Sequence, residues 1–131
     1  RGLGDVYKRQ VITSNHQPHE NEIREVEFPI APMGCIGTQI AFPMALTYLL
    51  DELDLETIVK TMSINPRTIL QTDIPVIKEG FVANLTLFDT HTEWKFDKSS
   101  NSSLSENTPM LDSTLKGKVH GTILGNYLHF S

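Results

Sequence analysis

The chain has 131 residues, 39% of them hydrophobic, and a single cysteine, Cys35. This length suits about one domain, and one cysteine cannot form an internal disulfide, which excludes a disulfide-stapled secreted scaffold. Eleven basic and sixteen acidic residues give a net charge of −5, and the basic residues are scattered, which argues against a nucleic-acid surface. The sequence has no apolar run near the ~18 residues of a membrane span and no signal-peptide core. We therefore expect a cytoplasmic protein with small-molecule or protein partners and no membrane partner.

Residues 1–10, RGLGDVYKRQ, show neither helical nor strand periodicity. They resemble a junction peptide that recurs at the ends of unrelated metagenomic translations. We therefore expect a non-native leader, followed by a fragment of a longer protein.

A short β-branched stretch at 11–13 predicts a buried strand that ends in polar residues. A long loop follows, from about His16 to Gly37, and loops of this length commonly carry function. We call residues 16–37 the long loop.

Three helices are predicted next. Apolar residues at three- and four-residue steps predict a first helix, which either begins near Phe42 with Pro43 in its first turn or is kinked at that proline. The side chain of Asp54 can cap a second helix. Asn65 and Pro66 then suit the cap and first position of a short third helix.

The pattern changes to strands after Gly80. Residues 85–89 and 115–123 alternate as strands do, and the turn residues at 125–126 predict a hairpin into a last strand at 127–130. The intervening polar stretch DKSSNSSLSENT, residues 97–108, predicts a mobile loop. We call it the serine-rich loop.

The densest polar cluster is SNHQPHE at 14–20. Its two histidines, His16 and His19, could ligate a metal, act as acid and base, or bind an anion. A solvated surface loop is the alternative, since no further Cys or His cluster completes a metal site. Cys35 suits a small buried thiol better than a nucleophile, and the other histidines are isolated: His91, His120 and His129.

Residues 12–19, ITSNHQPH, resemble the last barrel strand of dihydroorotases, whose motif reads Asp-His-x-Pro-His after two or three apolar residues. Further motifs are similar to this family, in its order and at roughly its spacing. They are Glu27-Phe28, Ala31-Pro32-Met33-Gly34, Gly37-Thr38-Gln39, Asn65-Pro66-Arg67, Lys78-Glu79-Gly80, residues 83–89, Asn107-Thr108-Pro109 and residues 115–119. The resemblance covers about residues 11–131.

The resemblance implies an α/β fold, the C-terminal part of a (β/α)₈ TIM barrel of the amidohydrolase superfamily, followed by part of a small β-sandwich-like domain. Residues 11–75 would supply the last barrel strand, the active-site loop and the closing helices, and residues 76–131 the C-terminal part of the β domain. The implied reaction is the zinc-dependent interconversion of dihydroorotate and N-carbamoyl-aspartate in pyrimidine biosynthesis.

The resemblance also assigns residues to roles. Asn15 stands where the family has a catalytic Asp that helps to hold the metal, and Gln39 stands where it usually has Glu. An amide has no usable basicity, so impaired catalysis is implied. His19 matches a histidine that grips the substrate carboxylate, and Pro32, Met33 and Gly34 match the loop whose backbone touches the substrate ring. The other family metal ligands belong to strands absent from this chain, so the fragment alone should bind no zinc.

Three hypotheses remain open. The first is an active dihydroorotase that tolerates Asn15. The second is a non-catalytic scaffold subunit that assembles with a carbamoyltransferase, an active paralogue or another copy of itself. The third is a sister hydrolase such as allantoinase or dihydropyrimidinase. Because apolar faces would lack their partners, we expect the isolated chain to aggregate or to stay partly unfolded.

Overall fold

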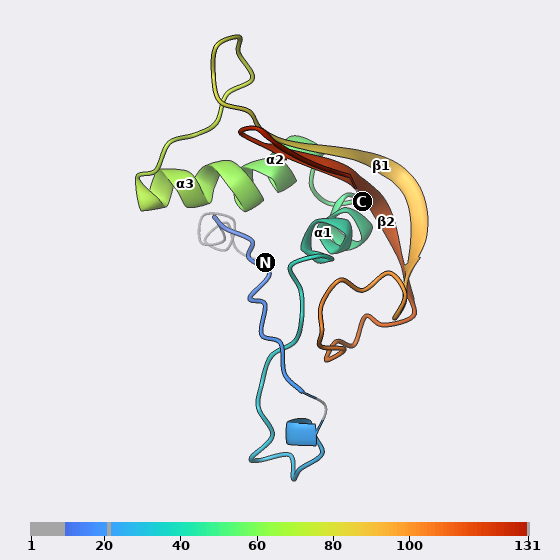
Figure 1. Cartoon of the computed structure of the whole chain (residues 1–131). Coiled ribbons are helices and arrows are strands. Elements are labelled where there is room, and N and C mark those ends of the chain that lie inside the picture. Colours follow the sequence, from blue (N-terminus) through green and yellow to red (C-terminus); the bar gives the residue numbers. More distant parts are fainter. Residues whose placement is uncertain (1–9, 21, 131) are drawn as a thin grey trace.

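The computed structural model describes residues 10–20 and 22–130, so residues 1–9 of the predicted leader lie outside the described residues. Helices pack beside a three-stranded sheet, and the long loop projects away from both (Figure 1). The elements in chain order are η2 (Glu22–Arg24), α1 (Ala41–Leu49), α2 (Leu55–Val59), η3 (Lys60–Ile64), α3 (Asn65–Leu70), β1 (Asn84–Phe96), β2 (Ser113–Leu124) and β3 (Tyr127–Phe130). None of the helices in the described part is long and apolar enough to cross a bilayer.

Pro43 lies in the first turn of α1, which confirms one of the two predicted alternatives. At the third helical position the N–H that proline lacks has no partner within the helix. One turn later, the Thr47 hydroxyl donates to the carbonyl of Pro43 at 2.7 Å and accepts the backbone N–H of Lys116 at 2.8 Å. This hydroxyl therefore ties α1 to β2.

The predicted cap of the second helix is confirmed, because the side chain of Asp54 accepts the backbone N–H of Thr57 at 2.7 Å. The third helix is not separate as predicted. Instead α2, the π-helical stretch η3 and α3 follow one another without a break. Pro66 lies at the start of α3, directly after the wider π turns, and proline has no N–H to place in a regular helical ladder.

The three strands form one antiparallel sheet in the order β1-β2-β3. Asn84 pairs with Leu124 at one end of the β1–β2 ladder, Phe96 pairs with Ser113 at the other, and Leu124 pairs with Tyr127 across the predicted hairpin. The predicted strands and hairpin are confirmed, and β1 runs further than the expected 85–89. The part of the chain that the structure describes forms this single sheet and no sandwich.

The hydrophobic core lies between α1 and the sheet. One buried cluster joins Ile36 and Ile40 to Phe96 and Leu115, and a second joins Ala45 and Leu46 of α1 to Ile58 of α2. Residues from both sides of position 75 thus share the first cluster, so the sheet fixes the start of α1 and the end of the long loop.

The strand predicted at 11–13 is wrong for this structure. The segment adopts no strand, and the backbone N–H of Ile12 donates to the carbonyl of Thr61 at 3.0 Å. A β-strand needs a neighbouring strand along its length to pair its backbone groups. The residues described here offer the 11–13 segment no such neighbour.

Candidate functional site

The site is built on the two legs of the long loop, which run side by side at their base. His16 and Cys35 form a parallel β-bridge, and the backbone N–H of Gln17 donates to the carbonyl of Cys35 at 2.9 Å. This pairing brings the histidine-containing leg next to the leg that carries Pro32, Met33 and Gly34.

His19 and Met33, two residues with predicted substrate-binding roles, are in direct contact. His19 Nε2 lies 3.1 Å from the backbone carbonyl of Met33. A carbonyl can only accept, so Nε2 carries a hydrogen and donates it. The imidazole is half-buried, whereas the Met33 side chain is 88% exposed. The Nε2–H group of His19 is thus bonded to a carbonyl at the edge of the loop, and a carboxylate could replace that carbonyl as its acceptor.

Gly34 meets two conditions that only glycine satisfies. Its φ is +110°, a conformation that L side chains rarely adopt. A Cβ atom there would lie 2.7 Å from Cβ of Gln17 and would overlap the rest of that side chain. Glycine at position 34 therefore lets the backbone approach the side chain of Gln17.

Asn15 is exposed and adopts a left-handed backbone conformation, with φ +42°, which asparagine tolerates better than most residues. Its Oδ1 accepts a hydrogen bond of 3.4 Å from Gln17 Nε2. Gln17 thus links Asn15 to the neighbourhood of Gly34. Pro32 is half-buried two residues before Gly34. Four of the five predicted site residues, His19, Pro32, Met33 and Gly34, therefore lie on the paired legs of the long loop, and Asn15 directly precedes it.

Both histidines of the long loop form hydrogen bonds with backbone groups and are not arranged as metal ligands. His16 Nδ1 accepts the backbone N–H groups of Gly37 at 3.1 Å and Thr38 at 3.3 Å, so the ring proton lies on Nε2. Within residues 10–20 and 22–130, no three His, Cys, Asp or Glu side chains are grouped so that they could hold a metal ion. These residues by themselves do not fit a zinc site.

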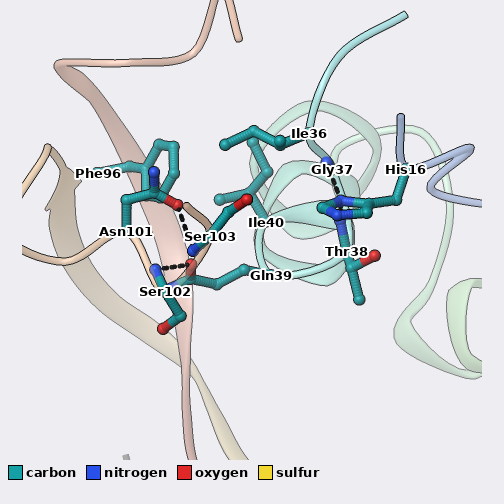
Figure 2. Close-up of a pocket in the computed structure, with 10 residues that line it drawn as sticks. All are labelled: His16, Ile36, Gly37, Thr38, Gln39, Ile40, Phe96, Asn101, Ser102 and Ser103. Atoms are coloured by element: carbon teal, nitrogen blue, oxygen red, sulfur yellow. Dashed lines mark hydrogen bonds between the residues drawn. The ribbon is translucent and has the colours of Figure 1, made fainter. Parts of the chain in front are cut away.

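The serine-rich loop, predicted as mobile, is hydrogen-bonded to this region. Gln39 Nε2 donates to the carbonyl of Ser100 at 2.6 Å, and Gln39 Oε1 accepts the backbone N–H of Ser102 at 2.8 Å. Figure 2 shows this side chain reaching across to Ser102 beside a cavity of about 260 Å³, whose apolar wall includes Ile36, Ile40 and Phe96. A glutamate could not donate to Ser100, so the amide of Gln39 has a structural use here.

Sequence reasoning missed two contributors, Ser105 and Asn107 of the serine-rich loop. Ser105 Oγ accepts the backbone N–H of His19 at 3.2 Å, and Asn107 Nδ2 donates to the carbonyl of Gln17 at 2.9 Å. The motif Asn107-Thr108-Pro109 was the only sequence signal for either residue. It contributed to the family resemblance, but the resemblance assigned Asn107 no role.

Asp89 and His120 form a separate polar pair on the sheet, with 2.7 Å between Asp89 Oδ2 and His120 Nε2. Hydrogen bonds from the backbone N–H of Thr92, from His120 and from the backbone N–H of His91 hold the pKa of the Asp89 carboxyl well below its usual range. The pair lies on β1 and β2, outside the long loop. His129 is exposed on β3.

Known proteins resemble this chain both in fold and in sequence. No protein-family model matches the chain. The fold is similar to part of a dihydroorotase-like domain: the chain superposes with a TM-score of 0.56 on the inactive dihydroorotase-like domain of the Chaetomium thermophilum CAD-like multifunctional protein, over 72% of this chain and 25% of that chain, at 17% identity.

The sequence comparison is more specific. Curated dihydroorotases match over most of the chain: that of Ruminiclostridium cellulolyticum is 37% identical over 88% of this chain, and that of Aquifex aeolicus is 38% identical over 94% of it. Over most of its length the chain is therefore similar to part of a dihydroorotase. It spans 27% and 28% of the length of these two relatives.

Proposed function

We propose that this chain is the C-terminal segment of a dihydroorotase-type protein and that it supplies substrate recognition to a cyclic amidohydrolase site. In this proposal residues 11–75 are the active-site loop and closing helices of a (β/α)₈ barrel together with the segment 11–13, which would become the last strand only beside the strands of the complete barrel, and residues 76–131 belong to a small β domain. The ligand is dihydroorotate or N-carbamoyl-aspartate. The 37–38% identity to curated dihydroorotases carries the proposal.

The geometry of the long loop supports this role. Both ligands are anions that carry amide-type N–H and C=O groups, and such a ligand needs a hydrogen-bond donor for its carboxylate and exposed backbone groups for its amide groups. His19 Nε2–H lies against the carbonyl of Met33, so one ligand could reach both. In the proposal the carboxylate takes the donor from Met33, and the freed carbonyl becomes an acceptor for a ring N–H.

Catalysis is impaired in this proposal because Asn15 replaces the family's Asp. Loss of a general base typically lowers a rate by about 10²–10⁴, and an amide cannot take up a proton at neutral pH. Zinc, the metal of the family, would supply an acidified water, but the described residues do not fit a zinc site. This segment is therefore assigned no metal ligand.

The test uses the complete protein encoded by the full reading frame. We expect Asn15→Asp to raise the rate of dihydroorotate hydrolysis by about 10²–10⁴, and His19→Ala to weaken dihydroorotate binding in calorimetry by about tenfold or more. His129→Ala, on exposed β3, is the matched control and should bind as wild type does. A protein that binds no zinc and turns over no faster after Asn15→Asp contradicts the impairment, and unchanged binding in His19→Ala contradicts the recognition role.

A non-catalytic scaffold is the second candidate. Asn15 favours it, and the solved neighbour is itself named an inactive dihydroorotase-like domain of a multifunctional protein. In this case the segment would assemble with a carbamoyltransferase or a second copy of the protein. The same assay separates the two: a scaffold shows no hydrolysis even with Asn15→Asp, and co-purifies with its partner at fixed stoichiometry. Hydrolysis of allantoin or dihydropyrimidines in place of dihydroorotate would favour a sister enzyme.

A further inference from the structure

The serine-rich loop places one fully buried amide against both legs of the long loop. Asn107 is 2% exposed. Its Nδ2 donates to the carbonyl of Gln17 at 2.9 Å and to the carbonyl of Gly34 at 3.3 Å. Its own backbone carbonyl accepts the N–H of Ile36 at 3.1 Å. One residue of the β1–β2 connection therefore spans the two legs.

The chemistry of these contacts requires an amide. Both carbonyl groups can only accept, so the amide nitrogen, with two hydrogens, must face them. The remaining Oδ1 accepts, and it lies 2.6 Å from the hydroxyl oxygen of Ser105. Aspartate at position 107 would set a carboxylate against two carbonyl oxygens, and alanine would leave buried acceptors without a donor. Asparagine therefore gives the carbonyl groups of Gln17 and Gly34 a common donor.

Ser105 extends the same contact to His19. Its hydroxyl oxygen accepts the His19 N–H at 3.2 Å and lies 2.5 Å from the His19 carbonyl oxygen. Asn101 in turn donates to the backbone carbonyl of Ser105 at 2.9 Å. The single hydroxyl hydrogen of Ser105 can go to either the His19 carbonyl or Asn107 Oδ1, whereas the bond from the His19 N–H to Ser105 Oγ is compatible with both choices.

We propose that Asn107 and Ser105 are positioning residues, which hold His19 and Gly34 at the separation that the substrate needs. The proposal rests on the proposed function of the long loop as a substrate site. Asn107 sets the spacing between the two legs, and Ser105 sets the backbone of His19, whose ring would meet the carboxylate. The serine-rich loop of the β unit would thereby complete a site whose binding groups all lie in the long loop.

The test uses the complete protein and two measurements, amide hydrogen exchange in the long loop and calorimetric affinity for dihydroorotate. We expect Asn107→Ala and Ser105→Ala to speed exchange at 17, 19 and 34–36 by about tenfold or more and to weaken affinity about as much. Exchange in β1 and β2 should stay unchanged. Ser105→Thr keeps the hydroxyl and should restore both values. Ser102→Ala is the control from the same loop, because Ser102 contacts Gln39 through its backbone N–H.

Each outcome decides the proposal. Unchanged exchange at 17, 19 and 34–36 in both alanine variants overturns it, and so does faster exchange with unchanged affinity. Should Asn107→Ala fail to fold, the Ser105→Ala and Ser105→Thr pair gives the answer. A wild-type protein that binds neither dihydroorotate nor N-carbamoyl-aspartate refutes the proposed function instead, and exchange alone then shows whether the two residues position the loop.

Discussion

Substitution of Gly34 by alanine should open the long loop, and the structure gives the size of the effect in two parts. The first is backbone strain: a non-glycine residue at φ +110° costs roughly 1–3 kcal/mol. The second is overlap, because the new Cβ would lie 2.7 Å from Cβ of Gln17, and overpacking of this kind costs roughly 1–3 kcal/mol. We expect a total of about 2–6 kcal/mol in the free energy of local opening.

Substitution of Gly80 distinguishes the cost of backbone strain from the cost of overlap. Its φ is +81°, but no atom lies within 4 Å of the Cβ position, so Gly80→Ala carries the strain alone. The assay is native-state hydrogen exchange on the amides around each glycine in the complete protein. Gly34→Ala should cost about 1–3 kcal/mol more than Gly80→Ala, and Gln17→Gly in the Gly34→Ala background should recover that difference. Equal costs at positions 34 and 80 would refute the reasoning.

Three further predictions follow from other parts of the structure. Gln39→Glu removes the donor to Ser100 and should lower protection of the serine-rich loop by about 1 kcal/mol in hydrogen exchange; unchanged protection contradicts the structural use of the amide. Leu115→Ala, at a fully buried position, should cost about 2–5 kcal/mol in chemical denaturation, whereas Leu124→Ala on the same strand, 61% exposed, should cost well under half as much. Because the folded state lowers the pKa of Asp89, its contribution to stability is present above about pH 4 and is lost as the pH falls further. Asp89→Asn should therefore flatten the acid side of the stability profile, and an unchanged acid limb contradicts this.

Local sequence signals predicted the helices and hairpins well where the deciding atoms lie within a few residues. The cap of Asp54 on Thr57, the place of Pro43 in α1 and the turn into β3 are all of this kind. The prediction of a strand at 11–13 was wrong because a strand depends on neighbouring strands that can lie far along the chain. Its apolar residues were visible in the sequence, but the segment that would pair with them was not.

The candidate site likewise depends partly on local sequence and partly on contacts between distant segments. The sequence by itself determined which residue types are available: a histidine at 19 and a glycine at 34 on the long loop, and an asparagine at 15 directly before it. Only the tertiary structure decided that the two legs of the loop lie side by side and that Gln17 and Asn107 connect them. The contacts of Asn107 reach residues 90 and 73 positions away, and a buried amide finds such carbonyl groups only once the core between α1 and the sheet has brought the two loops together.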